Sequence, residues 1–315
     1  MEYWVLAFYA LVKLDDPQRE VEKHKDFFKT RELTSRIYIS EQGINAQMSG
    51  PRGQVQEYMD WLQEDSRFAD LSFKIHSSPK NVFPKATIKV RKQLVAIDCE
   101  VDLKEGGEHV EPAVWKEMLA ARDEDTLVLD VRNDYEWKVG HFEGAELPAL
   151  ETFRQFPDYA KQLKETRDPK KTKVMMYCTG GIRCEFYSAV MKKEGFEQVY
   201  QLDGGVIQYG LDEGQSQWKG KLFVFDDRLV VPISGQEAPS IAVCKHCGVE
   251  GDVYYNCANM DCNALFVSCP ECVKKEKGCC SGECQSGRVR PTSGDATPFR
   301  KWDHEEKMRM RNAVC

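Results

Sequence analysis

Residues 173–184 read KVMMYCTGGIRC, and this stretch decides the fold of the middle of the chain. Lys173–Tyr177 is a short apolar run, typical of a strand covered on both faces of a parallel sheet. Cys178 follows at once, and Cys184–Glu194 has the pattern of a helix. Strand, loop and helix in this order place Cys178 at the carboxyl end of a strand, where open α/β sheets carry their sites.

The loop offers one candidate catalytic residue, Cys178, and six candidate loop residues: Thr179, Gly180, Gly181, Ile182, Arg183 and Cys184. Paired glycines permit a tight turn in which backbone N–H groups converge on one point. The helix N-terminus and the Arg183 guanidinium add positive potential there. A sulfur at that point is expected to have a lowered pKa and to be largely thiolate. The alternative is a buried, inert cysteine.

The length of the loop separates two chemistries. A cysteine phosphatase needs a larger cradle with an arginine six residues after the cysteine, whereas here Arg183 follows five residues after Cys178. The smaller ring of N–H groups favours a single bound atom, such as the outer sulfur of a persulfide. Cys184 is either a thiol that resolves an oxidised Cys178 or a packed helix residue.

The flanking sequence predicts an α/β domain over residues 108–218. Thr126–Val131 and Val199–Leu202 are further strand candidates, and Leu150–Leu163 is a helix candidate. Alternating strands and helices indicate a doubly wound parallel sheet.

Residues 1–105 predict a separate ferredoxin-like α+β domain, from the order β-α-β-β-α-β. The expected helices run from Asp16 to Glu32 and onward from Pro51. The expected strands are Tyr3–Val12, Arg36–Ile39, Asn45–Met48, Leu71–Ile75 and a last one near Leu94–Ile97.

Nine of the thirteen cysteines lie within residues 244–284, after a connector at 219–243. Two C-x2-C pairs and two further pairs would supply two structural zinc sites of four thiolates each. The predicted ligands are Cys244, Cys247, Cys257, Cys262, Cys269, Cys272, Cys280 and Cys284, with Cys279 or Cys280 in surplus. Sequential and cross-braced pairing both remain open, and disulfide, redox-buffer and Fe–S readings are the alternatives.

Charge and composition limit the partners. The net charge is −7, yet residues 72–97 contain six basic and no acidic residues, and residues 285–315 are predicted to be a basic flexible tail. The candidate RNA-binding residues are Lys80, Lys85, Lys89, Arg91 and Lys92. Phe83 lies among them as an aromatic that could stack on a base. The alternative is a solvated strand face.

Other features bear on location and cofactors. No apolar run approaches the roughly 20 residues that span a bilayer, and the N-terminus has no secretory signal. We therefore expect a cytoplasmic protein without a membrane partner. The sequence shows no flavin, haem or nicotinamide signal.

Further motifs carry a family resemblance. Asp130-Val131-Arg132 with Glu136, residues 140–145 (GHFEGA) and residues 202–205 (LDGG) resemble, with the Cys178 loop, the rhodanese domain. Residues 41–45 (EQGIN) with Ser49-Gly50, residues 178–185 (CTGGIRCE) and Gln208-Tyr209 extend the resemblance to the rhodanese-like tRNA uridine hydroxylases, over about residues 1–285.

The resemblance implies a function. Members of this family convert the wobble uridine of tRNA to 5-hydroxyuridine with molecular oxygen as co-substrate, so an N-terminal tRNA-facing domain and an essential Cys178 are expected. It also implies that Asp130, Arg132 and Glu136 stabilise the surroundings of the site. The alternative functions are a sulfurtransferase that carries a persulfide from a small-molecule donor, and a non-catalytic zinc-stabilised adaptor that binds RNA or protein.

Overall fold

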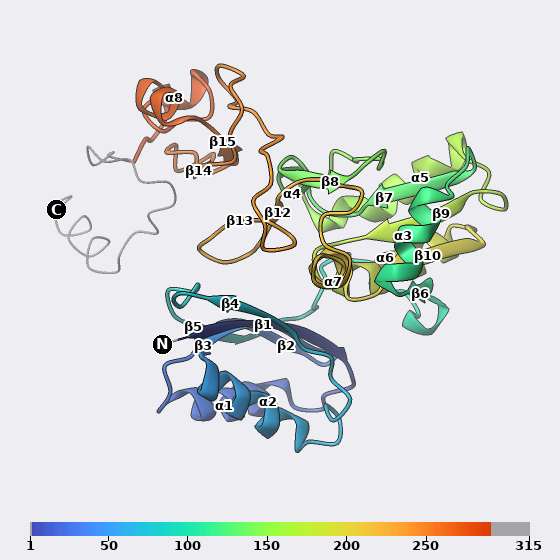
Figure 1. Cartoon of the computed structure of the whole chain (residues 1–315), viewed down its shortest axis with the longest axis vertical. Coiled ribbons are helices and arrows are strands. Elements are labelled where there is room, and N and C mark those ends of the chain that lie inside the picture. Colours follow the sequence, from blue (N-terminus) through green and yellow to red (C-terminus); the bar gives the residue numbers. More distant parts are fainter. Residues whose placement is uncertain (1, 291–315) are drawn as a thin grey trace.

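The computed structural model describes residues 2–290. They form an N-terminal α+β domain, a central α/β domain and a small C-terminal cysteine-rich module (Figure 1). Within this described range, no helix has both the length and the apolar character needed to cross a membrane.

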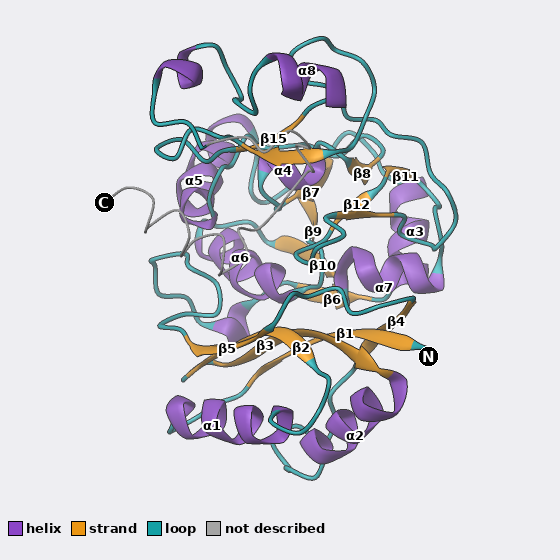
Figure 2. Cartoon of the chain, turned by 90° about the vertical axis from the view of Figure 1, so that its left-hand side faces the viewer, coloured by secondary structure: helices purple, strands orange, loops and turns teal. Residues whose placement is uncertain are grey.

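The N-terminal domain is one sheet with two helices on a single face. The strands are β1 (Tyr3–Leu11), β2 (Thr34–Ser40), β3 (Gly43–Pro51), β4 (Lys74–Ser78) and β5 (Ala86–Val90). Their order is β4-β1-β3-β2-β5, and only β5 pairs in parallel, with β2. Helices α1 (Pro17–Phe28) and α2 (Arg52–Gln63) cover one face, and the other face looks toward the central domain (Figure 2). The predicted ferredoxin-like order is confirmed, with β5 added at the edge.

Three predicted boundaries in this domain were wrong. The helix expected to reach Glu32 ends at Phe28, and the strand expected from Leu71 begins at Lys74. The last strand is β5, and Leu94–Ile97 is not a strand. Val95 and Ile97 are instead buried in the core of the central domain, because the chain crosses between the two domains there.

The central domain contains a parallel four-stranded sheet in the order β6-β10-β9-β7. Its strands are β6 (Glu108–Val110), β7 (Thr126–Asp130), β9 (Lys173–Tyr177) and β10 (Gln198–Leu202). Alternate residues of β9 enter two cores: Val174 and Met176 pack with helices α5 (Phe156–Thr166) and α6 (Ile182–Lys193), whereas Met175 and Tyr177 pack on the other side. Helices α3 (Pro112–Ala120) and α7 (Gly205–Asp212) supply that second core. The predicted doubly wound sheet is confirmed.

One helix of this domain begins later than predicted. Helix α5 was expected from Leu150 and starts at Phe156, after a short 3-10 turn at Phe153–Gln155. Pro157 stands in the first turn, where its missing N–H and fixed φ fit a helix start. The remaining short elements are η1 (Leu103–Glu105), α4 (Asp134–Trp137) and β8 (Gly140–Phe142).

The segment predicted as a connector packs on the central domain. Strand β11 (Trp218–Gly220) pairs with β8, and β12 (Leu222–Phe223) pairs with β13 (Val230–Val231). Leu222, Val224 and Ile233 are buried in the same core as Trp115. Residues 219–243 therefore extend the central domain.

The cysteine-rich module contains β14 (Tyr254–Asn256), β15 (Leu265–Val267), α8 (Pro270–Lys275) and η3 (Glu283–Ser286). Tyr254 and Val267 are buried against Val139 and Phe223, which fixes the module on the central domain. The start of the predicted flexible tail is folded, since Val289 forms a β-bridge with Asn259. The rest of that tail, residues 291–315, lies outside the described residues.

Candidate active site and metal centres

The Cys178 loop closes around the sulfur of Cys178. The Gly181 N–H donates to Cys178 Sγ at 3.2 Å, and Gly181 has a φ of +102°, a conformation that other residues rarely adopt. A Cβ at Gly181 would also lie 3.0 Å from the Tyr9 hydroxyl of the N-terminal domain. This glycine is needed both for the turn and for the approach of the neighbouring domain.

Helix α7 holds the loop from the other side. The N–H groups of Val206 and Ile207 donate to the carbonyls of Cys178 and Thr179, each at 3.0 Å. A Cβ at Gly205 would come within 2.6 Å of the Cys178 carbonyl oxygen, so this contact requires glycine. Helix α7 therefore fixes the backbone of Cys178 and Thr179, beside the Gly181 N–H that donates to the sulfur.

Arg183 is fixed by an ion pair that the sequence did not reveal. Its guanidinium makes two hydrogen bonds to the Glu136 carboxylate, at 2.5 and 2.8 Å, and a third to the Thr179 hydroxyl at 3.2 Å. Arg183 and Glu136 are almost completely buried. A second ion pair, between Asp130 and Arg132, is completely buried in the central domain. Glu136 therefore acts on the site directly, by orienting Arg183.

Cys178 is held as a thiolate. Burial alone raises the pKa of this thiol, but a hydrogen bond from the Cys184 side chain, the Arg183 charge and the N–H groups of residues 183 and 184 outweigh it. The pKa is lowered to about 5. Burial raises the pKa of Cys184, which stays a neutral hydrogen-bond donor.

Cys178 reaches an interdomain cavity. The residue is only 1% exposed, yet it lines a cavity of about 240 Å³. The opposite wall comes from the N-terminal sheet, including Tyr9, Asn45 and Lys74. A small group that enters the cavity can therefore meet the sulfur there.

Two residues of the N-terminal domain belong to this site and were missed from the sequence. Lys74 is 5% exposed, and its ammonium donates to the Gly180 carbonyl at 3.3 Å. Burial lowers the pKa of Lys74, and the negative charges of Asp203, Cys178 and Glu185 oppose that change. Tyr9 donates to Glu185. In strand β1, Tyr9 and Ala7 alternate with the buried Leu6 and Phe8. This alternation places Tyr9 on the face of the sheet opposite to the helices, and it was the signal in the sequence that could have identified the residue.

The predicted RNA-binding residues lie on the segment that runs from the end of β4, at one edge of the N-terminal sheet, through β5 at the other edge. Lys80, Lys85, Lys89, Arg91 and Lys92 are all exposed. Phe83 was expected to be free for stacking and is instead buried against Val5 and Val82, because it fills a small apolar cluster under the sheet edge.

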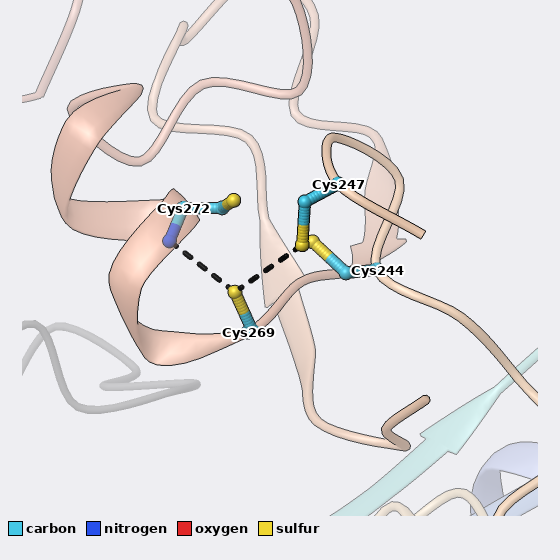
Figure 3. A group of neighbouring side chains, drawn as sticks. All are labelled: Cys244, Cys247, Cys269 and Cys272. Atoms are coloured by element: carbon cyan, nitrogen blue, oxygen red, sulfur yellow. Dashed lines mark hydrogen bonds between the residues drawn. The ribbon is translucent and has the colours of Figure 1, made fainter. Parts of the chain in front are cut away.

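Two groups of four cysteines converge in the C-terminal module. The first is Cys244, Cys247, Cys269 and Cys272 (Figure 3), and the second is Cys257, Cys262, Cys280 and Cys284. Within each group all four sulfurs lie within 4.8 Å of one another. The structure thus groups the two C-x2-C pairs, which is the cross-braced arrangement, and it uses Cys280.

The sulfur geometry fits a tetrahedral metal site. Four sulfurs at the zinc–thiolate distance of about 2.3 Å lie about 3.8 Å apart along each tetrahedral edge. In the first cluster, the sulfurs of Cys247 and Cys269 are 3.8 Å apart. In the second, the sulfur of Cys280 lies 3.8 Å from that of Cys284 and 3.7 Å from that of Cys262. The surplus Cys279 is buried, and its thiol points to the Lys277 carbonyl. Both clusters can therefore hold a metal ion.

Three family models match successive parts of the chain. Residues 3–94 match the UPF0176 acylphosphatase like domain, residues 112–211 the rhodanese-like domain, and residues 219–285 the rhodanase C-terminal domain. A solution structure of a rhodanese-like domain from an Anabaena protein is 20% identical, with a TM-score of 0.30, over 36% of this chain and 78% of that one. The chain is a rhodanese-domain protein with an acylphosphatase-like domain before it.

Two curated relatives define the family more narrowly. The tRNA uridine(34) hydroxylase of Protochlamydia amoebophila is 54% identical over 305 residues, which cover 96% of this chain and 95% of that protein. The tRNA uridine(34) hydroxylase of Chlamydia abortus is also 54% identical, over 95% and 93% of the two chains. The chain belongs to the tRNA uridine(34) hydroxylase family, as its resemblance suggested.

Proposed function

We propose that this protein hydroxylates uridine 34 of tRNA at C5, in an oxygen-dependent reaction that requires Cys178. The observation that carries the proposal is a thiol with a pKa of about 5 facing an interdomain cavity, in a chain that is 54% identical to a tRNA uridine(34) hydroxylase over almost its full length. We also propose that tRNA approaches over the exposed basic edge at residues 80–92.

The thiolate suits this substrate chemically. In uracil, C6 is the electrophilic end of the C5=C6–C4=O system, and a thiolate can add to it. The S–C6 bond forms, the C5=C6 electron pair moves to C5, and C5 becomes the electron-rich carbon that hydroxylation modifies. A solvent proton then adds at C5, the original C5 hydrogen leaves as a proton, and the electron pair of that C–H bond re-forms C5=C6 and expels the thiolate. This reversible cycle exchanges the hydrogen at C5 with solvent.

For the two cysteine clusters we propose zinc. Four thiolates around each ion leave no open position, so the ions would be structural. Metal binding would also supply folding energy to a short module with a small apolar core. Because the module packs against Phe223, which contacts Phe225 at the cavity wall, it would support the active site.

The decisive experiment compares tRNA nucleosides from cells that lack this protein, complemented with the wild type or with Cys178→Ser. Loss of 5-hydroxyuridine that only the wild type restores supports the hydroxylase. Unchanged 5-hydroxyuridine with altered thiolated nucleosides contradicts it and favours sulfur transfer. No change in either nucleoside class contradicts both and leaves the adaptor.

A further inference from the structure

Two rows of side chains cross the face of the N-terminal sheet that looks onto the Cys178 loop. In the first row, Tyr9 on β1 pairs with Asn45 on β3, which pairs with Tyr38 on β2. In the second row, Gln47 stands between Ala7 and Arg36. All these residues line the cavity that contains Cys178, so the sheet presents a polar wall to the sulfur.

The remaining walls are largely apolar and belong to the other domain. Phe153, Ile207 and Phe225 line the cavity beside the loop. The volume of about 240 Å³ exceeds the roughly 150 Å³ cavity that accommodates benzene. Apolar walls with a few polar groups are typical of a site for a small ligand.

The polar wall carries unused hydrogen-bonding groups. Asn45 and Gln47 are half-buried, and within residues 2–290 neither side-chain amide has a hydrogen-bond partner. An amide offers a donor and an acceptor side by side. The polar edge of uracil offers the complement, an N3–H donor between two carbonyl acceptors.

We propose that this cavity binds a single uracil base turned out of an RNA loop, with Asn45 and Gln47 hydrogen-bonded to its polar edge. The inference rests on the proposed function and adds the subsite and the residues that recognise the base. Enzymes that act on a base commonly extrude it into such a pocket, which costs least when the base is already single-stranded. Base-edge hydrogen bonds and aromatic side chains are the usual means of reading single-stranded RNA.

The rest of the nucleotide has a path out of the cavity. The row through Asn45 and Tyr38 continues to Lys89 on β5, which is exposed at the sheet edge. The Arg91 guanidinium lies over the Tyr38 ring, 4.6 Å from its centroid. A base among the polar side chains therefore places its ribose and phosphates near these two cations.

The test is a binding measurement that needs no turnover. Full-length protein carrying Cys178→Ser is titrated with two anticodon stem-loop RNAs that differ only at position 34, where one has uridine and the other an abasic ribose. We expect the uridine RNA to bind roughly tenfold more tightly, the usual contribution of one captured base. In the Asn45→Ala, Gln47→Ala double variant the two RNAs should bind about equally.

The control is Gln18→Ala on helix α1, on the far side of the sheet, which should keep the tenfold preference. An unchanged thermal unfolding midpoint shows that the double variant is folded. Equal binding of the two RNAs by the protein with Asn45 and Gln47 intact overturns the proposal, as does a preference that survives the double substitution. Equal binding of the two RNAs, together with thiosulfate that binds at Cys178 of the wild-type protein, would overturn it in favour of a sulfur-donor pocket.

Because no hydroxylation is measured, this test is separate from that of the proposed function. A preference for uridine 34 together with unchanged 5-hydroxyuridine in Cys178→Ser cells would retain the base site and refute the role of the thiol. Loss of 5-hydroxyuridine in Cys178→Ser cells, together with equal binding of the two RNAs, would support the role of the thiol and refute the base site.

Discussion

Tyr9 donates a 2.7 Å hydrogen bond to Glu185, a residue 176 positions later in the chain. Tyr9 belongs to the N-terminal sheet, and Glu185 stands in the first turn of the helix that follows the Cys178 loop. Glu185 also contacts His109, at 3.3 Å. One carboxylate therefore ties the cavity wall of the first domain to the loop of the second.

Replacing Tyr9 with phenylalanine tests this tie. The substitution removes one hydrogen bond to a partly buried carboxylate, a contact worth about 2 kcal/mol. We expect the free energy of unfolding in urea to fall by that amount. Tyr3→Phe, in the same strand, is the matched control and should change it little. An equally stable Tyr9→Phe protein would show that the hydrogen bond does not hold the domains together.

The same contact predicts a dependence on pH. Hydrogen bonds to Glu185, followed in importance by its charge and the contact with Asp203, raise the pKa of His109 above 6.5. A raised pKa in the folded state stabilises the protein fully below the unfolded value of about 6.5, and this stabilisation is lost as pH rises through the folded pKa. The His109 contribution to the unfolding free energy should therefore decline from pH 6 to pH 8, against the opposite trend from the Cys178 thiolate. The difference in unfolding free energy between the wild type and His109→Gln, which isolates that contribution, should shrink over this range. An identical pH profile in His109→Gln would contradict the prediction.

The ionisation of Cys178 can be measured directly. The rate of alkylation by iodoacetamide, followed on the peptide that contains Cys178, should rise to half its maximum near pH 5. Cys184→Ala removes the hydrogen bond that lowers this pKa most. The pH of half-maximal alkylation should therefore rise by roughly one to two pH units. Cys184→Ser keeps a donor and should stay near the wild type. A half-maximum at pH 8.5 in the wild type would contradict the thiolate.

The sequence predicted those parts of the site whose residues lie close together along the chain. The Cys178 loop, its strand and its helix lie within 21 residues, and local chemistry sets most of their geometry. Spacing predicted the cysteines of the two clusters except for the choice between Cys279 and Cys280. It did not predict their grouping, because both pairings use the same set of cysteines. The choice of Cys280 over Cys279 depends on which sulfur the backbone turns toward Cys262 and Cys284, since both side chains are buried.

The cavity depends on contacts that no local pattern encodes. Lys74 and Gly180 are 106 positions apart, and Tyr9 and Glu185 are farther still. The strand expected at Leu94–Ile97 failed for a similar reason, since its apolar residues are buried by the other domain. The polar residues Asn45 and Gln47, which alternate with buried Ile44 and Ala46, were visible in the sequence. What they face depends on the docking of the two domains.

Metal content distinguishes ligands from neighbouring cysteines. Protein purified under reducing conditions should contain about two zinc ions, and Cys247→Ser should lower this to about one. Cys279→Ser is the matched control: its sulfur lies beside the second cluster without belonging to it, so two ions should remain. Metal loss in Cys279→Ser, or full zinc content in Cys247→Ser, would refute the assignment.

The thiolate role predicts exchange at C5 of the substrate. A stem-loop RNA with deuterium at C5 of uridine 34 should lose it to solvent in the absence of oxygen, since thiolate addition and elimination need no oxidant. Cys178→Ser should abolish the exchange. Mass spectrometry of the nucleoside gives the measurement. Retention of deuterium by an enzyme that hydroxylates the same RNA in air would rule out addition at C6.

The basic edge should contribute to tRNA binding through phosphate contacts. Lys89→Glu with Arg91→Glu should weaken binding and make it less sensitive to salt, because each lost phosphate contact reduces the slope of log affinity against log salt by about 0.7 on single strands. Two lost contacts then reduce it by about 1.4. Lys25→Glu, exposed on helix α1 on the opposite face of the sheet, carries the same charge change and should alter the slope little. Equal slopes for the double variant and the Lys25 control would mean that the tRNA does not contact this edge, and the phosphates would have to follow another path from the cavity.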